Sequence, residues 1–181
     1  MKLNYVEQKL LKKVNLFDYK DNNVNMNRVI SKFGLRSSKE YRQYNKVALE
    51  IQQLVAILRT LPSESEVRQK IGKSLLDKLY RLGIINDVSS LEVVENFGVS
   101  YLCRRRITWI LKKIKMAQHT QHAIDLVQHG HIKIGNDVVK DPAMLVTRQM
   151  EDLITWADGS KYKKHISEFH DTKDDFTLLN L

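Results

Sequence analysis

Six cationic side chains gather in a twenty-residue stretch that contains no acidic residue. Residues 101–120 hold three arginines in a row and then three lysines, namely Arg104, Arg105, Arg106, Lys112, Lys113 and Lys115. A solvated helix face usually mixes both signs, whereas a stretch of one sign creates a positive potential that a polyanion senses. Arginine can also hold a phosphate through two parallel hydrogen bonds. The stretch therefore predicts contact with a phosphate backbone, with a merely solubilising face as the alternative.

Residues 101–116 also have the apolar spacing of one amphipathic helix. Arg105 and Lys112 point away from its apolar face, and Trp109 and Met116 fall opposite that face. We expect the second pair to pack against N-terminal helices, with base stacking or a protein partner as alternatives. The predicted apolar face consists of Cys103, Ile107, Ile110, Leu111 and Ile114.

Other chemistry finds little support in the sequence. Four histidines lie close together, but no cysteine is near them and their spacing matches no known ligand pattern, so we expect no metal. Cys103 lies on the apolar helix face, where thiols are usually inert. The seven glycines are scattered and form no phosphate-binding loop. We therefore expect neither an enzyme nor a cofactor. The histidines are His119, His122, His129 and His131.

The composition favours a helical protein and argues against a disulfide-linked or membrane-spanning one. The chain has 181 residues, a formal net charge of +9, seven glycines and two prolines, so helix should dominate. One cysteine excludes an internal disulfide and favours a reducing compartment. No apolar run reaches the roughly 20 residues of a membrane span, and residues 1–9 lack the apolar core of a signal peptide. We expect an intracellular, soluble protein.

Two capping boxes, each a serine followed three residues later by a glutamate, predict two long helices. Ser37 with Glu40 begins the first, and Ser63 with Glu66 begins the second, which Gly83 ends in a left-handed conformation. A short connection between them fits a helical hairpin. The predicted buried stripe of the second helix is Val67, Ile71, Leu75, Leu79 and Leu82.

Four shorter segments complete the N-terminal and C-terminal parts. Residues 7–14 predict a basic helix, which is either a frayed terminus or an arm that contacts a partner or RNA. Residues 18–25 predict a loop and residues 90–97 a short helix. The tail after residue 158 changes from basic to acidic and is either flexible or a docking strip.

The remaining stretch predicts a helix followed by a small sheet. Residues 120–129 have helical spacing and end at Gly130. Residues 131–139 alternate with period two around Gly135-Asn136, which indicates a hairpin. A further strand is predicted at 153–156.

This order of helix, turn, helix and Gly-His-Ile hairpin resembles the RNA-binding module named after small-subunit ribosomal protein four. The resemblance covers residues 104–156 and implies a mainly α fold with a small β part. It implies an N-terminal helical region at 1–100, the RNA-binding module at 101–158 and a tail at 159–181. The matching residues include Arg105, Arg106, Ile107, Gly130, His131, Ile132, Val139, Pro142, Val146, Asp152 and Ile154.

By position, the resemblance implies RNA contacts from the first helix, its turn and the adjoining hairpin. The chain departs from the family pattern at Thr108, where aspartate is common, and at His119, where a serine or threonine cap is common. Thr120 and Ile124 stand where arginines often reach RNA, so the second helix is expected to be the weaker ligand. The predicted RNA-binding set is Arg104, Arg105, Arg106, Lys112, Lys113, Lys115, His119, Thr120, Gln121, His131 and Lys133.

Segments outside the module extend the resemblance over nearly the whole chain. They are similar to the Imp-type subunits of the U-three small nucleolar ribonucleoprotein, a component of the small-subunit processome. That resemblance implies a place in the nucleus and nucleolus, and binding to U-three small nucleolar RNA and pre-ribosomal RNA. It also implies a Brix-domain partner and a large scaffold protein, with no membrane and no small-molecule substrate. The quoted segments are 7–14, 75–80, 103–106, 130–132, 141–148 and 150–156.

Two alternatives stay open beside this hypothesis. One is a structural protein of the small ribosomal subunit, which shares the module. The other is a protein–protein adaptor whose positive helix meets an acidic scaffold.

Overall fold

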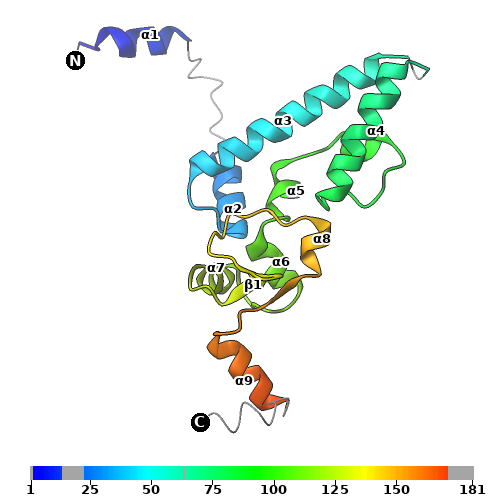
Figure 1. Ribbon diagram of the computed structural model, residues 1–181. Helices are drawn as coiled ribbons and strands as arrows, with labels where there is room; N and C mark the ends of the chain where they lie inside the picture. The colour runs from blue at the N-terminus through cyan, green and yellow to red at the C-terminus, as the bar shows by residue number, and fades with distance from the viewer. Residues whose placement is uncertain (1, 14–22, 63, 171–181) are drawn as a thin grey trace.

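The structure is a computed structural model that describes residues 2–13, 23–62 and 64–170. Most of the described residues are helical and a small sheet lies in the C-terminal part, which confirms the expected fold class (Figure 1). No described helix combines the length and apolar character needed to cross a membrane. The first elements are α1 (Tyr5–Lys13), α2 (Asn23–Phe33), α3 (Ser38–Thr60), α4 (Glu66–Arg81), the 3-10 helix η1 (Leu91–Val94) and α5 (Val99–Cys103). The others are α6 (Ile107–Lys113), α7 (Thr120–Gln128), β1 (Ile132–Ile134), β2 (Asp137–Val138), α8 (Arg148–Glu151), β3 (Ile154–Trp156) and α9 (Lys161–Phe169).

Helices α3 and α4 form the predicted antiparallel hairpin (Figure 1). Gly83 follows α4 at φ +71°, as its predicted role requires. The buried stripe of α4 differs in part from the prediction: Leu79 is buried as expected, but Val67 and Ile71 are 54% and 41% exposed. The other buried positions are Gly72 and Leu76, where the helix meets α3 and η1.

Helix α3 begins where its capping box predicts, but without the hydrogen bond of the serine, and α4 begins two residues later than its box predicts. Ser37 precedes α3 but its side chain makes no capping hydrogen bond. Glu40 instead accepts from the Arg36 amide at 2.9 Å and from a distant arginine described below. Helix α4 begins at Glu66 after Ser65, while Ser63 lies outside the described residues.

The C-terminal module packs α6 and α7 against a three-stranded antiparallel sheet of order β2-β1-β3. This confirms the predicted helix at 120–129, the hairpin and the third strand. Strand β1 pairs with β3 in a register that places Ile134 opposite Ile154. The core of the module is formed by Ile107, Ile110, Leu111, Ala123, Leu126, Val127, Ile132, Val146 and Ile154.

The prediction of one helix across residues 101–116 is wrong. Helix α5 ends at Cys103, residues 104–106 form a turn, and α6 begins at Ile107. The turn pairs with a distant segment, because the Ile107 amide donates to the Met144 carbonyl at 2.9 Å. The Val146 amide in turn donates to the Arg105 carbonyl at 2.8 Å. These two bonds hold residues 105–107 in an extended bridge, which interrupts the helix and redirects its arginines.

Helix α2 occupies part of the predicted loop at 18–25, of which residues 18–22 lie outside the described residues. Its last residue, Phe33, packs on Trp109 with ring centroids 4.8 Å apart. This contact confirms the expectation that Trp109 packs against an N-terminal helix. Helix α9 likewise lies in the predicted tail, and residues 90–97 contain only the short η1.

Candidate RNA-binding surface

The Arg106 side chain lies fully inside the protein and joins the module to the N-terminal hairpin. Its Nη1 donates to the Glu40 carboxylate on α3 and to the Tyr44 hydroxyl, the latter at 3.2 Å. Two other nitrogens, Nε and Nη2, are buried without an acceptor among the described residues. Burial acts to lower the pKa of Arg106, but the hydrogen bond to Glu40, the interactions with Tyr44 and the charge of Glu40 together outweigh it, so the pKa is raised. The guanidinium therefore stays charged, and Glu40 is the carboxylate that compensates it.

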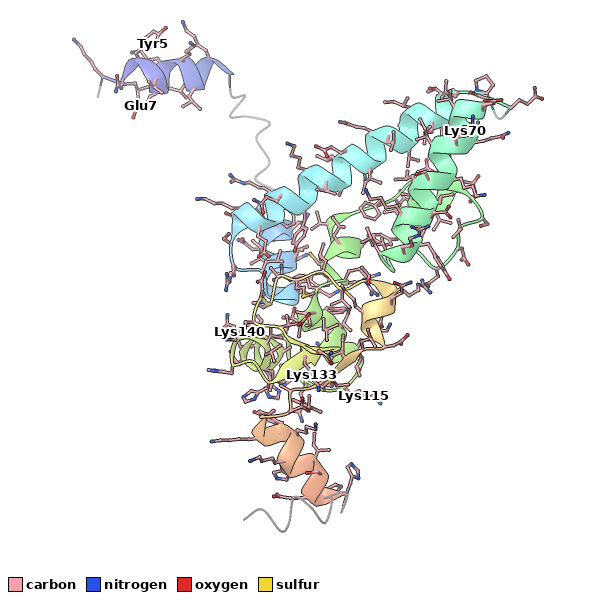
Figure 2. The ribbon with its side chains drawn as sticks, viewed as in Figure 1. Tyr5, Glu7, Lys70, Lys115, Lys133 and Lys140 are labelled. Carbon is pink, nitrogen blue, oxygen red and sulfur yellow. The ribbon has the colours of Figure 1, made fainter. Side chains whose placement is uncertain are left out.

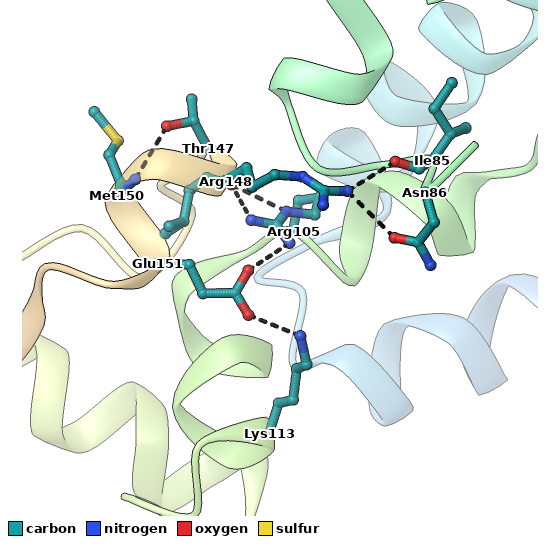
Figure 3. Close-up of polar contacts among 9 residues, drawn as sticks. Ile85, Asn86, Arg105, Lys113, Thr147, Arg148, Met150 and Glu151 are labelled. Atoms are coloured by element: carbon teal, nitrogen blue, oxygen red, sulfur yellow. Dashed lines mark hydrogen bonds and ion pairs between the residues drawn. The ribbon is translucent and has the colours of Figure 1, made fainter. Parts of the chain in front are cut away.

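Arg105 is held in the opposite direction, toward α8. Its guanidinium donates twice to the Val146 carbonyl, at 3.0 and 2.8 Å, and once to Glu151 at 2.9 Å (Figure 3). Lys113 donates to the other oxygen of the same carboxylate at 2.7 Å. The hydrogen bond from Lys113 and the contacts with Arg105 lower the pKa of Glu151. This carboxylate therefore fixes the turn and the end of α6 together.

These contacts do not fit the expectation that Arg105 and Arg106 reach RNA. The two residues are only 8% and 0% exposed, and protein acceptors hold their guanidinium groups. A sequence shows the sign of each charge but not which residue pairs with it. The carboxylate that pairs with Arg106, Glu40, lies 66 residues earlier in the chain. Both guanidinium groups therefore hold the fold through contacts within the protein.

Four predicted residues of the module are exposed and pair with no carboxylate in the described parts of the chain. We call Arg104, Lys112, Lys115 and His119 the exposed set. The Arg104 guanidinium lies 5.7 Å from the Tyr101 ring centre, and the Lys112 Nζ lies 5.4 Å from that of Trp109. Lys113 is 65% exposed beside them although it contacts Glu151. Figure 2 shows Lys115 on the surface of the module.

Lys115 has an unusual backbone conformation, with φ +66°. It ends α6 in a Schellman motif, in which the Met116 amide donates to the Leu111 carbonyl at 3.0 Å. Glycine fills this left-handed position most easily, and other residues cost about 1–2 kcal/mol there. A strained position that keeps a long cationic side chain points to a role for that side chain.

The predicted residues of α7 are placed less favourably for RNA. Thr120 and Ile124 face Gly34 at the end of α2, where an added Cβ on Gly34 would lie 2.7 Å from the Ile124 Cδ1. The N-terminal region therefore packs on this face of α7. Gln121 is exposed and donates to Asp125 at 3.4 Å.

The predicted residues of the sheet have partners in the protein. The His131 Nδ1 lies 3.0 Å from the Ser160 hydroxyl. Lys133 donates to Asp158 at 2.8 Å. Hydrogen bonds from Lys133 and then Lys163 lower the pKa of Asp158 to about 2. His131 and Lys133 thus belong to a local network beside the start of α9.

The geometry supports neither a metal site in the described residues nor a reactive thiol at Cys103. Within the residues that the structure describes, no group of three or more potential ligands could hold a metal ion. Cys103 is fully buried, and burial raises its pKa to about 11 against the opposing charge of Arg106. Its thiol is therefore protonated at neutral pH and poorly nucleophilic.

The sequence did not reveal three residues on which this arrangement depends. Glu40 and Glu151 hold the buried arginines, and Tyr101 supplies the ring beside Arg104. A possible signal was the absence of acids from residues 101–120, because buried arginines in that stretch must find carboxylates elsewhere in the chain.

Comparison with known proteins identifies the class. Residues 2–97 match the family model of the ribosomal protein S4/S9 N-terminal domain, and residues 105–152 match that of the S4 domain. The small ribosomal subunit protein uS4 of Hyperthermus butylicus is 32% identical over 75% of this chain and 76% of its own length. The fold and these matches define an S4-type RNA-binding protein, as the sequence predicted.

Two further relatives identify the family within that class. The U3 small nucleolar ribonucleoprotein protein IMP3 of Mus musculus is 42% identical over 98% of this chain and 97% of its own length. The protein of the same name from Saccharomyces cerevisiae is 38% identical over 97% of each chain. The chain belongs to this IMP3 family, which confirms the resemblance found in the sequence.

Replacing Glu40 with alanine should strongly destabilise the protein, because it leaves the charged Arg106 buried without its carboxylate. Losing one partner of a buried pair typically costs about 3–5 kcal/mol. Urea unfolding followed by tryptophan fluorescence measures the loss. The matched control is Glu50→Ala on the same helix, whose pair with Lys46 is exposed at 4.0 Å and should contribute less than about 1 kcal/mol. Equal losses in the two variants would contradict this role for Glu40.

The lowered pKa of Glu151 predicts a pH-dependent stability. A carboxyl group whose pKa is lower in the folded state than its ordinary value of 4.5 stabilises the fold above that value. The contribution is lost as pH falls through the lowered pKa. Glu151→Gln should therefore be less stable than wild type at neutral pH, and the difference should shrink below pH 4.5. Urea unfolding at several pH values tests this, and a constant difference would count against it.

Replacing Lys115 with glycine should separate folding from binding. Relief of the left-handed strain should raise the free energy of unfolding by up to about 1 kcal/mol, whereas loss of the cation should weaken RNA binding. Thermal unfolding and an RNA titration measure the two effects. Lys140→Gly is the control for folding, because Lys140 is exposed but has no positive φ, and it should show no gain in stability. A Lys115→Gly protein that binds RNA as tightly as wild type would exclude Lys115 from the interface.

Proposed function

We propose that this protein is an RNA-binding assembly factor of the small-subunit processome. In this role it stabilises the pairing of U3 small nucleolar RNA with pre-ribosomal RNA. The observation that carries the proposal is the match to U3 small nucleolar ribonucleoprotein relatives over nearly the whole chain, S4 domain included. At the coarser level, family membership supports an RNA-binding role in ribosome biogenesis.

The exposed set gives this role a physical basis. Two RNA strands that pair bring their phosphates close together, and cations at the surface reduce the resulting repulsion. Each phosphate neutralised by lysine or arginine also releases a counterion, which favours binding. Paired RNA hides base edges in its deep groove, so recognition by shape and phosphate position suits this surface.

The buried pairs make the exposed cations effective. Arg105 and Arg106 anchor the turn on both sides, so Arg104 and α6 project from a rigid base. A preorganised surface loses less conformational entropy on binding than a flexible one. Of the three consecutive arginines, Arg105 and Arg106 therefore hold the turn, and Arg104 contacts RNA.

The proposal extends to the setting of the protein. We place it in the nucleus and nucleolus, with a Brix-domain protein and a large scaffold protein as partners and with no catalytic role. We also keep the division into a helical region at 1–100, the RNA-binding module at 101–158 and the tail at 159–181. The α3–α4 and α6–α7 parts have separate apolar clusters, and the first of them includes Leu102, just past the proposed boundary.

A structural protein of the small ribosomal subunit is the second candidate. The similarity to uS4 favours it, although that match spans less of the chain than the IMP3 match. Sedimentation of cell extracts separates the two, because a ribosomal protein stays in mature subunits and polysomes. An assembly factor is found in large precursor particles instead.

Replacing Arg104, Lys112 and Lys115 together with glutamine should weaken binding to a duplex of U3 RNA and pre-ribosomal RNA. Three lost phosphate contacts should also reduce the slope of log affinity against log salt by roughly 2–3. Fluorescence anisotropy over a salt series measures both quantities.

A control of equal charge change is Lys46, Lys70 and Lys73 replaced with glutamine. These lysines lie on the α3–α4 hairpin, outside the module, and Figure 2 marks Lys70 near the tip of the hairpin. The control should change affinity much less. Equal losses would show a general charge effect and reject the assignment of the exposed set.

A further inference from the structure

A cavity of about 400 Å³ lies between the loop that follows α4 and the turn between α5 and α6. Its lining combines aromatic, cationic and hydrogen-bonding groups, and its volume falls within the usual range for organic ligands. The residues that matter are Tyr101, Trp109, Arg104, Lys113, Asn86 and Asp87.

The ring of Tyr101 offers a fixed surface in this cavity. It stacks on Phe97, with ring centroids 5.4 Å apart and planes 23° apart, so its orientation is set by the core. Arg104 lies over the same ring and is exposed, so its guanidinium can move aside. Because Phe97 takes one face of the ring, a planar group stacks on the other face by displacing the guanidinium, which then meets the charged part of that group.

The polar groups of the cavity complement this ring. Lys113 donates one hydrogen bond to Glu151, and its ammonium group carries three donors, so it can also meet a phosphate. Asn86 accepts from Arg148 at 3.2 Å through its carbonyl oxygen, and its amide nitrogen has no partner among the described residues. Asp87 is exposed beside it. Amide and carboxylate groups of this kind can bind the edge of a nucleobase.

The walls of the cavity are tied together before any ligand binds. Arg148 donates to the Ile85 carbonyl at 3.0 Å (Figure 3). Its guanidinium also lies 4.2 Å from the Tyr80 ring centre. On the other side, the Arg105 guanidinium lies against Gly83, where an added Cβ would come within 2.7 Å of its Cζ. The loop at 83–87 is therefore fixed to both α8 and the arginine turn.

We propose that this cavity receives one unpaired nucleotide of the bound RNA, with its base stacked on Tyr101 and its phosphate held by Arg104 and Lys113. This inference rests on the proposed function and makes its ligand more specific. Arg104 belongs both to the cavity and to the exposed set, so a strand on the outer surface can place one extruded base inside. Free nucleotides share this chemistry but lack the neighbouring phosphates that the exposed set would hold.

The test compares two RNA duplexes of the same sequence, one of which carries a single-nucleotide bulge. Wild-type protein should bind the bulged duplex about tenfold more tightly, since stacking a base on an aromatic side chain contributes on the order of this factor. Tyr101→Leu should abolish the preference, and Tyr101→Phe should keep it. Phe169→Leu is the matched control, because that ring is 78% exposed on α9, and it should keep the preference.

A second readout avoids any folding defect in the variants. A 2-aminopurine base at the bulge should lose fluorescence when wild-type protein binds, because stacking quenches it. Equal affinity for both duplexes, or a bulge whose fluorescence is unchanged by binding, would overturn the inference while leaving the proposed function intact. Weak binding to both duplexes would instead count against the proposed function. Uridine monophosphate that displaces the bulged RNA at comparable concentration would point to a free nucleotide site and also overturn the inference.

Discussion

The structure depends on a charged guanidinium placed in the protein interior. Removing an ion from water is unfavourable by several kcal/mol, so Arg106 can be buried only because Glu40 and Tyr44 meet it. Such a pair adds little net stability compared with apolar packing, but it tolerates few alternative arrangements. It therefore fixes how the module sits on α3. Arg105, one residue earlier, fixes the same turn on α8 through Glu151 and the Val146 carbonyl.

The charge of a sequence is therefore a poor guide to the charge of a surface. Residues 101–120 contain six cations, but two are buried and Lys113 shares a carboxylate with one of them. The cations that a polyanion could still contact form a smaller group, and the buried Arg105 and Arg106 hold the turn next to it. For recognition by shape, the spacing of a few rigid cations matters more than their total number.

Local patterns predicted the elements that depend on local interactions. Helices α3, α4 and α7, the β1–β2 hairpin and the left-handed Gly83 all follow from spacing and turn chemistry. The break between α5 and α6 could not be predicted in this way, because it is caused by hydrogen bonds to residues 144–146. The same holds for Glu40, whose position three residues after Ser37 matched a capping box although its partner is Arg106. Tertiary contacts overrode a plausible local signal in both cases.

The end of α2 packs closely against α7. Gly34 approaches Ile124 and Thr120 so closely that an added Cβ would meet the isoleucine, so these two side chains are partly buried against the N-terminal region. Phe33 covers Trp109 in the same region, so this side of the module is occupied by the protein itself. The end of α6, where Lys115 holds a strained conformation, and the turn that carries Arg104 lie outside these contacts and stay exposed. The packing of the N-terminal region on α7 thus leaves the accessible cations of the module on α6 and on the turn before it.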